Sequence, residues 1–81
     1  MTKTFKISAA QRVNLKDEFL GNLLGSVGLS AQPGPRSSRL VEGSPEQLRE
    51  LAGLVFMHRG KSAGRRRSIL SGVLKSINSV L

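Results

Sequence analysis

The sequence predicts an all-α fold, a small domain of three helices. Three stretches carry apolar residues at spacings of three and four, the period of a helix with one buried face. Two of these stretches begin with a Ser-x-x-Gln capping box. The segment between them is rich in turn formers and has no such period. With 81 residues and no cysteine, the chain is expected to form one domain without disulfides.

Residues 1–8 are expected to form an arm before the first helix. The stretch from Thr2 to Ile7 mixes β-branched, aromatic and basic residues, which suits a short strand. A lone strand is not stable, so this one would have to pair with a second copy or with a partner. A disordered terminus is the other interpretation, and the sequence leaves both open.

Ser8 and Gln11 form the first capping box and predict a helix over 9–27. Gly28 is expected to end this helix.

Residues 28–43 are expected to be a linker or a long surface loop, mobile over 29–43. Two prolines and a glycine lie within 32–35, and no apolar period runs through the segment. Loops of this length in small domains are often functional or disordered. Arg36 and Arg39 are candidates for secondary phosphate contacts.

Residues 44–81 contain the clearest local signals and are expected to form a helix-turn-helix-like unit. Ser44 starts a second capping box, with Pro at the first helical position, and predicts a helix over 45–58. Gly60 is expected to end that helix in a left-handed turn. A third helix is predicted over 63–80.

The apolar stripes of the three helices predict the core. Its expected members are Val13, Phe19, Leu20, Leu23, Leu24, Leu48, Leu51, Val55, Phe56, Ile69, Leu70, Val73, Leu74 and Ile77. The stripe over 69–81 is wide for its length, so a homodimer formed through it is a further expectation.

Positive charge is concentrated in the C-terminal part of the chain. The formal net charge is +8, from 13 Lys and Arg against 5 Asp and Glu. No acidic residue occurs after Glu50. Three arginines occupy the first turn of the third helix, where the helix dipole disfavours cations unless an anion binds there. Successive residues step about 100° around a helix, so the three cannot all face one side.

These features predict a small basic nucleic-acid-binding regulatory protein, with DNA preferred to RNA, that contacts phosphates through the basic turn 59–67. The order 45–58, 59–62, 63–80 resembles a helix-turn-helix. The expected contact residues are Arg59, Lys61, Arg65, Arg66, Arg67 and Lys75, with Arg36 and Arg39 as secondary contacts.

Two other functions remain open. One is a small inhibitor or adaptor, of phage, viral or secretion-system type, that docks its apolar helices on a partner protein. The other, the least favoured, is an amphipathic binder of membrane surfaces.

The residue types argue against catalysis. The chain has no cysteine, one histidine and five scattered carboxylates, so no enzyme activity, metal, cofactor or small-molecule substrate is expected. No apolar run approaches the ~20 residues of a membrane span, and no signal peptide is evident. A cytoplasmic location is therefore expected.

Overall fold

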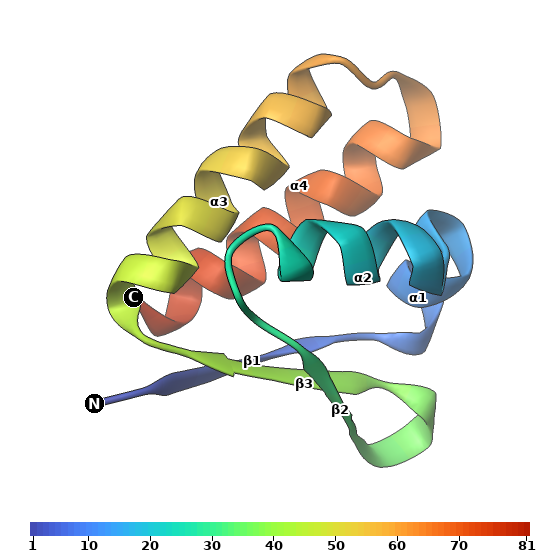
Figure 1. The fold of residues 1–81 in the computed structure, drawn as a ribbon. Coiled ribbons are helices and arrows are strands. Elements are labelled where there is room, and N and C mark those ends of the chain that lie inside the picture. The colour runs from blue at the N-terminus through green and yellow to red at the C-terminus, as the bar shows by residue number, and fades with distance from the viewer.

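A three-stranded antiparallel sheet lies beneath four α-helices in the computed structural model, which describes residues 1–81 (Figure 1). The fold is therefore α+β, and the prediction of an all-α domain is wrong. In chain order the elements are β1 (Lys3–Ile7), α1 (Ala9–Leu15), α2 (Asp17–Gly25), β2 (Ala31–Pro33), the 3₁₀ turn η1 (Pro35–Ser37), β3 (Arg39–Gly43), α3 (Pro45–Gly60) and α4 (Gly64–Val80).

The central strand of the sheet is β3, which pairs with β1 on one side and with β2 on the other. Val41 lies opposite both Phe5 of β1 and Ala31 of β2. Phe5, Ile7 and Val41 are buried under the helices, whereas alternate residues such as Thr4 and Glu42 face solvent. The N-terminal arm is thus a strand, and its pairing partner is in the same chain rather than in a second copy.

The predicted loop over 28–43 instead contains β2, η1 and β3. Hydrogen bonds from the Gly34 amide to the Ser38 carbonyl (3.0 Å) and from the Ser38 amide to the Pro35 carbonyl (3.0 Å) close the connection between the two strands. Pro33 is compatible with a sheet because β2 is an edge strand. The prediction failed because both strands are short, β3 is stabilised by pairing with β1, which is distant in sequence, and β2 is stabilised only by pairing with β3.

The predicted helix over 9–27 is divided at Lys16 into α1 and α2. Lys16 has a positive φ of 69°, and its amide donates a hydrogen bond to the Arg12 carbonyl (2.8 Å). The capping box before α1 is confirmed by two bonds between Ser8 and Gln11. Gly28, expected to end the helix, lies beyond it; its φ of 75° turns the chain toward β2.

The two C-terminal helices are confirmed within two residues of their predicted ends. Bonds between Ser44 and Gln47 form the capping box at the start of α3. Gly60 is the last residue of α3, as expected, but the helix does not end there in a left-handed turn, because Gly60 has no positive φ. The left-handed glycine is Gly64, with a φ of 63°, at the start of α4.

The core lies between the helices and the inner face of the sheet. Nine predicted members are buried: Leu20, Leu23, Leu24, Leu48, Leu51, Val55, Leu70, Val73 and Ile77. Phe19, Ile69 and Leu74 are partly buried against them. The sequence missed Phe5, Ile7, Leu15, Leu29 and Val41.

Two predicted core residues are exposed. Val13 is 79% exposed because the break at Lys16 reorients α1, so that Leu15 is buried instead. Phe56 is 55% exposed because it lies beside the buried stripe of α3 rather than on it.

The apolar stripe over 69–81 faces inward, against α3 and β1. Leu81, at 43%, is its most exposed member. The expected homodimer therefore stays a prediction, and most of the surface assigned to it is used within the chain.

Candidate nucleic-acid interface

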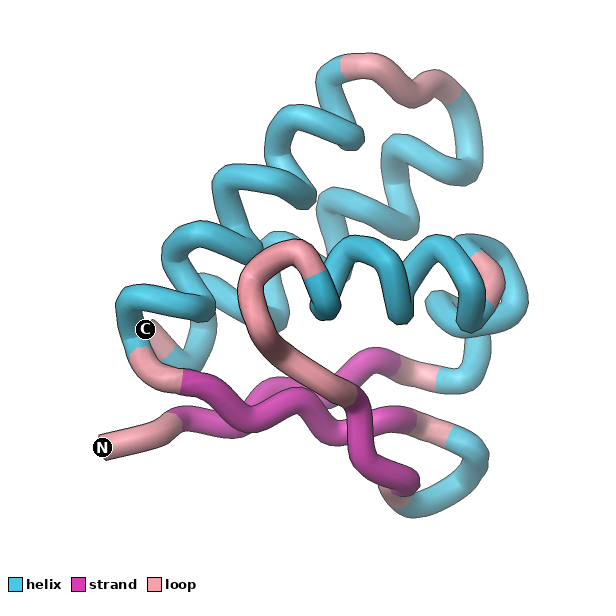
Figure 2. The backbone as a smooth tube through the Cα atoms, in the orientation of Figure 1, coloured by secondary structure: helices cyan, strands magenta, loops and turns pink.

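Three connections between elements lie along one side of the molecule, on the right in Figures 1 and 2. They are the α3–α4 turn, the α1–α2 junction at Lys16, and the β2–β3 connection that contains η1. The N- and C-termini lie on the opposite side (Figure 2).

The α3–α4 turn is joined to the start of α2 by contacts around Phe19. The Arg66 guanidinium lies over the Phe19 ring, 4.5 Å from its centroid. The His58 ring meets the same ring edge-on, with centroids 5.2 Å apart. One aromatic side chain of α2 thus contacts the end of α3 and the beginning of α4.

The α1–α2 junction is joined to the β2–β3 connection by Arg12. Its guanidinium binds Asp17 in a fork, with Nε–Oδ1 at 3.0 Å and a terminal nitrogen to Oδ2 at 2.8 Å. It also donates a hydrogen bond to the carbonyl of Ser37. The hydrogen bonds from Arg12 lower the pKa of Asp17, so this carboxylate is ionised and paired.

Positive charge is segregated along this side of the molecule, which we call the basic end. Its ten cationic residues are Lys6, Arg12, Lys16, Arg36, Arg39, Arg59, Lys61, Arg65, Arg66 and Arg67. Lys6 is included because it lines a surface hollow together with Arg36. Its acidic residues are Asp17, paired with Arg12, and Glu18, which forms no ion pair. The basic end therefore carries +8. The remaining cations, Lys3, Arg49 and Lys75, balance Glu42, Glu46 and Glu50.

The N-terminus of α4 adds backbone donors to this surface. Its N-cap, Ala63, has no side chain that can bond the free amides, and no acidic residue occurs in the first turn. The first amides of a helix have no partner within the helix and attract anions. Arg65, Arg66 and Arg67 lie in the first turn of α4, next to this uncapped terminus.

The three consecutive arginines have different surroundings. Arg65 and Arg67 are exposed and form no hydrogen bond or ion pair. Arg66 is the member that turns toward the body of the protein, over Phe19. Only Arg65 and Arg67 are therefore free to contact an external anion without breaking an internal contact.

The other predicted residues of the basic turn also differ. Lys61 is exposed. Arg59 is half-buried over the Phe56 ring, 5.0 Å from its centroid, and its buried Nε has no hydrogen-bond partner. Lys75 is exposed but lies about 15 Å along α4 from Arg65, at 1.5 Å per residue. The structure does not bring Lys75 together with the rest.

The predicted secondary contacts join the same surface. Arg36 is exposed in η1, and Arg39 is half-buried at the start of β3. The sequence missed Lys6, Arg12 and Lys16. Its only available signal was their charge, because their position depends on the break at Lys16 and on the pairing of β1.

No group of three or more His, Asp or Glu side chains is placed to hold a metal ion. Every helix is too short or too polar to cross a bilayer. Comparison with protein families, curated proteins and solved structures found no significant match.

Proposed function

We propose that this domain binds nucleic acid, in particular duplex DNA, by contacting phosphates with the basic end. The observation that carries the proposal is charge segregation: the basic end holds +8 and the rest of the chain is balanced. Phosphate neutralisation by Lys and Arg supplies most of the sequence-independent affinity for DNA. The uncapped N-terminus of α4 supports the same proposal.

The arrangement of elements also favours DNA. The helix-turn-helix predicted within 44–81 has no support, because α3 and α4 pack along each other. By contrast, α1 and α2 run in different directions and are joined by a single residue. In Figure 1, α1 is viewed nearly along its axis and α2 is viewed from the side. A hairpin follows this pair, which is the chain order of winged helix-turn-helix DNA-binding domains. The likeness is one of topology alone.

Duplex DNA suits this surface better than a single strand. Binding of single strands usually needs exposed aromatic rings on which bases stack. The chain has three aromatic residues of the Phe, Tyr and Trp type. Phe5 is buried, Phe19 lies between His58 and Arg66, and Phe56 lies under Arg59. Phe56 is the one exposed ring and it lies under the Arg59 guanidinium, so the basic end has no group of several open rings on which bases could stack.

Salt dependence of binding to a mixed-sequence duplex tests the proposal. Arg65→Ala with Arg67→Ala removes two exposed cations of the basic end. Arg49→Ala with Lys75→Ala removes the same charge elsewhere.

For the wild type we expect three to five phosphate contacts, hence a slope of log affinity against log salt of roughly −3 to −5. The first variant should reduce the slope by about two, and the second should leave it unchanged. Equal effects of both variants would contradict an interface at the basic end.

Docking on a partner protein is a second proposed function, favoured by one observation. Phe56 and Met57 are adjacent on α3 and are 55% and 54% exposed. Large apolar side chains exposed side by side are typical of protein contacts. Capture of proteins from nuclease-treated lysate should then be lost with Met57→Ser, while DNA binding persists. Equal capture by the variant would count against this second function.

Membrane binding is not proposed. The apolar side of α4 is packed against α3 and β1, so it is not free to insert among lipids.

A further inference from the structure

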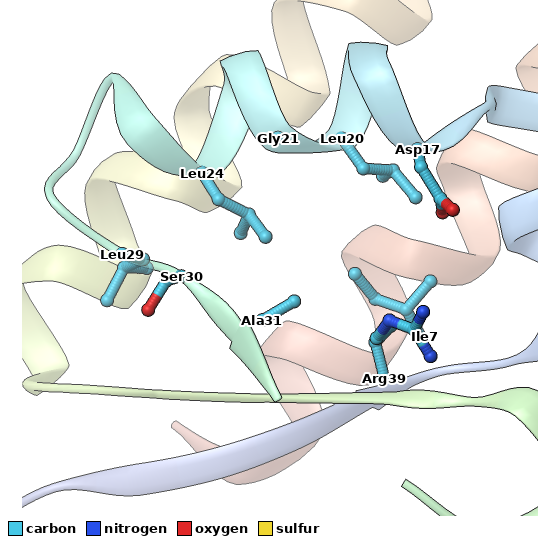
Figure 3. A pocket seen from close by; sticks show the side chains of 9 residues that line it. All are labelled: Ile7, Asp17, Leu20, Gly21, Leu24, Leu29, Ser30, Ala31 and Arg39. Atoms are coloured by element: carbon cyan, nitrogen blue, oxygen red, sulfur yellow. The ribbon is translucent and has the colours of Figure 1, made fainter. Parts of the chain in front are cut away.

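A half-enclosed cavity of about 320 Å³ lies between α2 and the strands (Figure 3). Its apolar walls are Ile7 of β1, Leu20 and Leu24 of α2, and Leu29 in the connection to β2. Leu20 and Leu24 point from α2 toward the sheet in Figure 3. The volume falls at the lower end of the range for small-molecule sites.

The cavity exists because small residues face each other across it. Gly21 of α2, Ser30 and Ala31 line it without filling it. A Cβ placed on Gly21 would meet nothing within 4 Å. The edge strand β2 has only three residues, all exposed, so α2 has little to pack against on that side.

One end of the cavity carries charge. Asp17 and Arg39 lie together at this end (Figure 3). Both oxygens of Asp17 are already bound by Arg12. Arg39 forms no ion pair, and its one hydrogen bond goes to the Ser38 carbonyl at 3.2 Å. Across Arg12, Asp17 and Arg39 the net charge is +1, and the guanidinium that lines the cavity with free donors is that of Arg39.

We propose that this cavity binds a small carboxylate with an apolar body, whose head pairs with the Arg39 guanidinium and whose body contacts Ile7, Leu20, Leu24 and Leu29. A guanidinium matches a carboxylate with two parallel hydrogen bonds. The apolar walls exclude a ligand that is polar throughout. This inference does not rest on nucleic-acid binding.

Titration of the full ¹⁵N-labelled chain with octanoate, below its micelle concentration, tests the proposal by NMR. Amide shifts should saturate and be confined to the residues that line the cavity, among them Leu20, Leu24 and Arg39. Replacement Arg39→Gln should weaken octanoate binding about tenfold and leave binding of 1-octanol unchanged, since the alcohol has no charge to lose.

Two leucine variants of α2 distinguish binding in the cavity from binding elsewhere on the surface. Gly21→Leu should abolish binding of octanoate and octanol, because the new side chain occupies the cavity. It should still fold, since nothing lies close to that position. Gly25→Leu adds the same side chain at an equally open position that does not line the cavity, and should leave binding intact.

Three outcomes would overturn the proposal. The first is a set of shifts that do not saturate or that spread over the whole molecule. The second is equal binding by the wild type and by Gly21→Leu. The third is tighter binding of octylamine than of octanoate, which would make Asp17 rather than Arg39 the partner of the ligand head.

Discussion

Lys16 combines a strained backbone with an exposed positive charge. Its φ of 69° and ψ of 143° lie outside the regions that L-residues normally adopt. Such a residue costs of the order of 1–3 kcal/mol and is often found at functional sites. In this chain it separates α1 from α2 at the basic end.

The first prediction concerns replacement Lys16→Gly. Glycine adopts this conformation freely, although it loses more entropy on folding. We expect the free energy of unfolding to rise by about 1 kcal/mol, measured by urea denaturation. Affinity for DNA should fall, since a cation is lost. Lys16→Ala should lower affinity equally without the gain in stability. If alanine stabilises as much as glycine, the strain at this position is not real.

The second prediction concerns pH and the ion pair between Arg12 and Asp17. Hydrogen bonding to Arg12 lowers the pKa of Asp17 in the folded state. Its contribution to stability is thus present above the unfolded pKa of about 3.9 and is lost as pH falls through the lower folded value. The effect is modest because the Asp17 side chain is 65% exposed.

Urea midpoints of the wild type and of Asp17→Asn, compared at pH 7 and at pH 3, check this second prediction. The difference between the two proteins should shrink at the lower pH. A difference that is the same at both pH values would show that the carboxylate charge does not stabilise the fold.

At the scale of elements, β3 and the segment before β2 pack closely. Gly43, at the end of β3, is buried against Leu29. A Cβ on Gly43 would come within 2.6 Å of Leu29 Cδ2. Leu29 is itself only 8% exposed, so it has little room to move.

The third prediction follows from this close packing. Gly43→Ala should destabilise the protein by about 1–3 kcal/mol, the usual cost of overpacking a core. Gly53→Ala is the matched control, because Gly53 lies in the middle of α3 with nothing within 4 Å. That control should instead stabilise by up to about 1 kcal/mol through helix propensity. Thermal or urea denaturation gives both values, and changes of the same sign would contradict the packing.

At the scale of the whole molecule, the dimensions limit the size of the proposed DNA site. The principal extents are 36 × 27 × 21 Å. One base pair advances the duplex by about 3.4 Å, so one copy cannot cover more than about 11 base pairs. The basic end carries cations on both the β2–β3 connection and the α3–α4 turn. If the proposed function holds, both must reach phosphates for full affinity.

The fourth prediction is therefore a dependence on duplex length. Affinity per site should rise with length and level off by about 11 base pairs, measured by fluorescence anisotropy with duplexes of graded length. Shortening the duplex should also lower the salt slope, as contacts from one connection are lost. Affinity that keeps rising well beyond this length, after correction for the number of sites, would indicate several copies or another binding mode.

Local signals in the sequence predicted α3 and α4 well. The Ser44 capping box and the apolar period of both helices lie within short segments, and short-range rules decide such features. Because these two helices were predicted correctly, the basic residues between them were also assigned correctly to the α3–α4 turn. By contrast, the break at Lys16 has no signal in residue type, because lysine normally avoids positive φ.

The sequence by itself determined the caps, the two C-terminal helices, most of the helical core and the presence of a basic segment. Only the tertiary structure decided that Phe5 pairs opposite Val41, across 36 positions of the chain. It alone also placed Arg12, Arg36 and Arg66 on one side of the molecule. The physical reason is that strand pairing and the joining of distant turns depend on contacts between segments far apart in sequence. Helix caps and apolar stripes depend on neighbours three or four residues away.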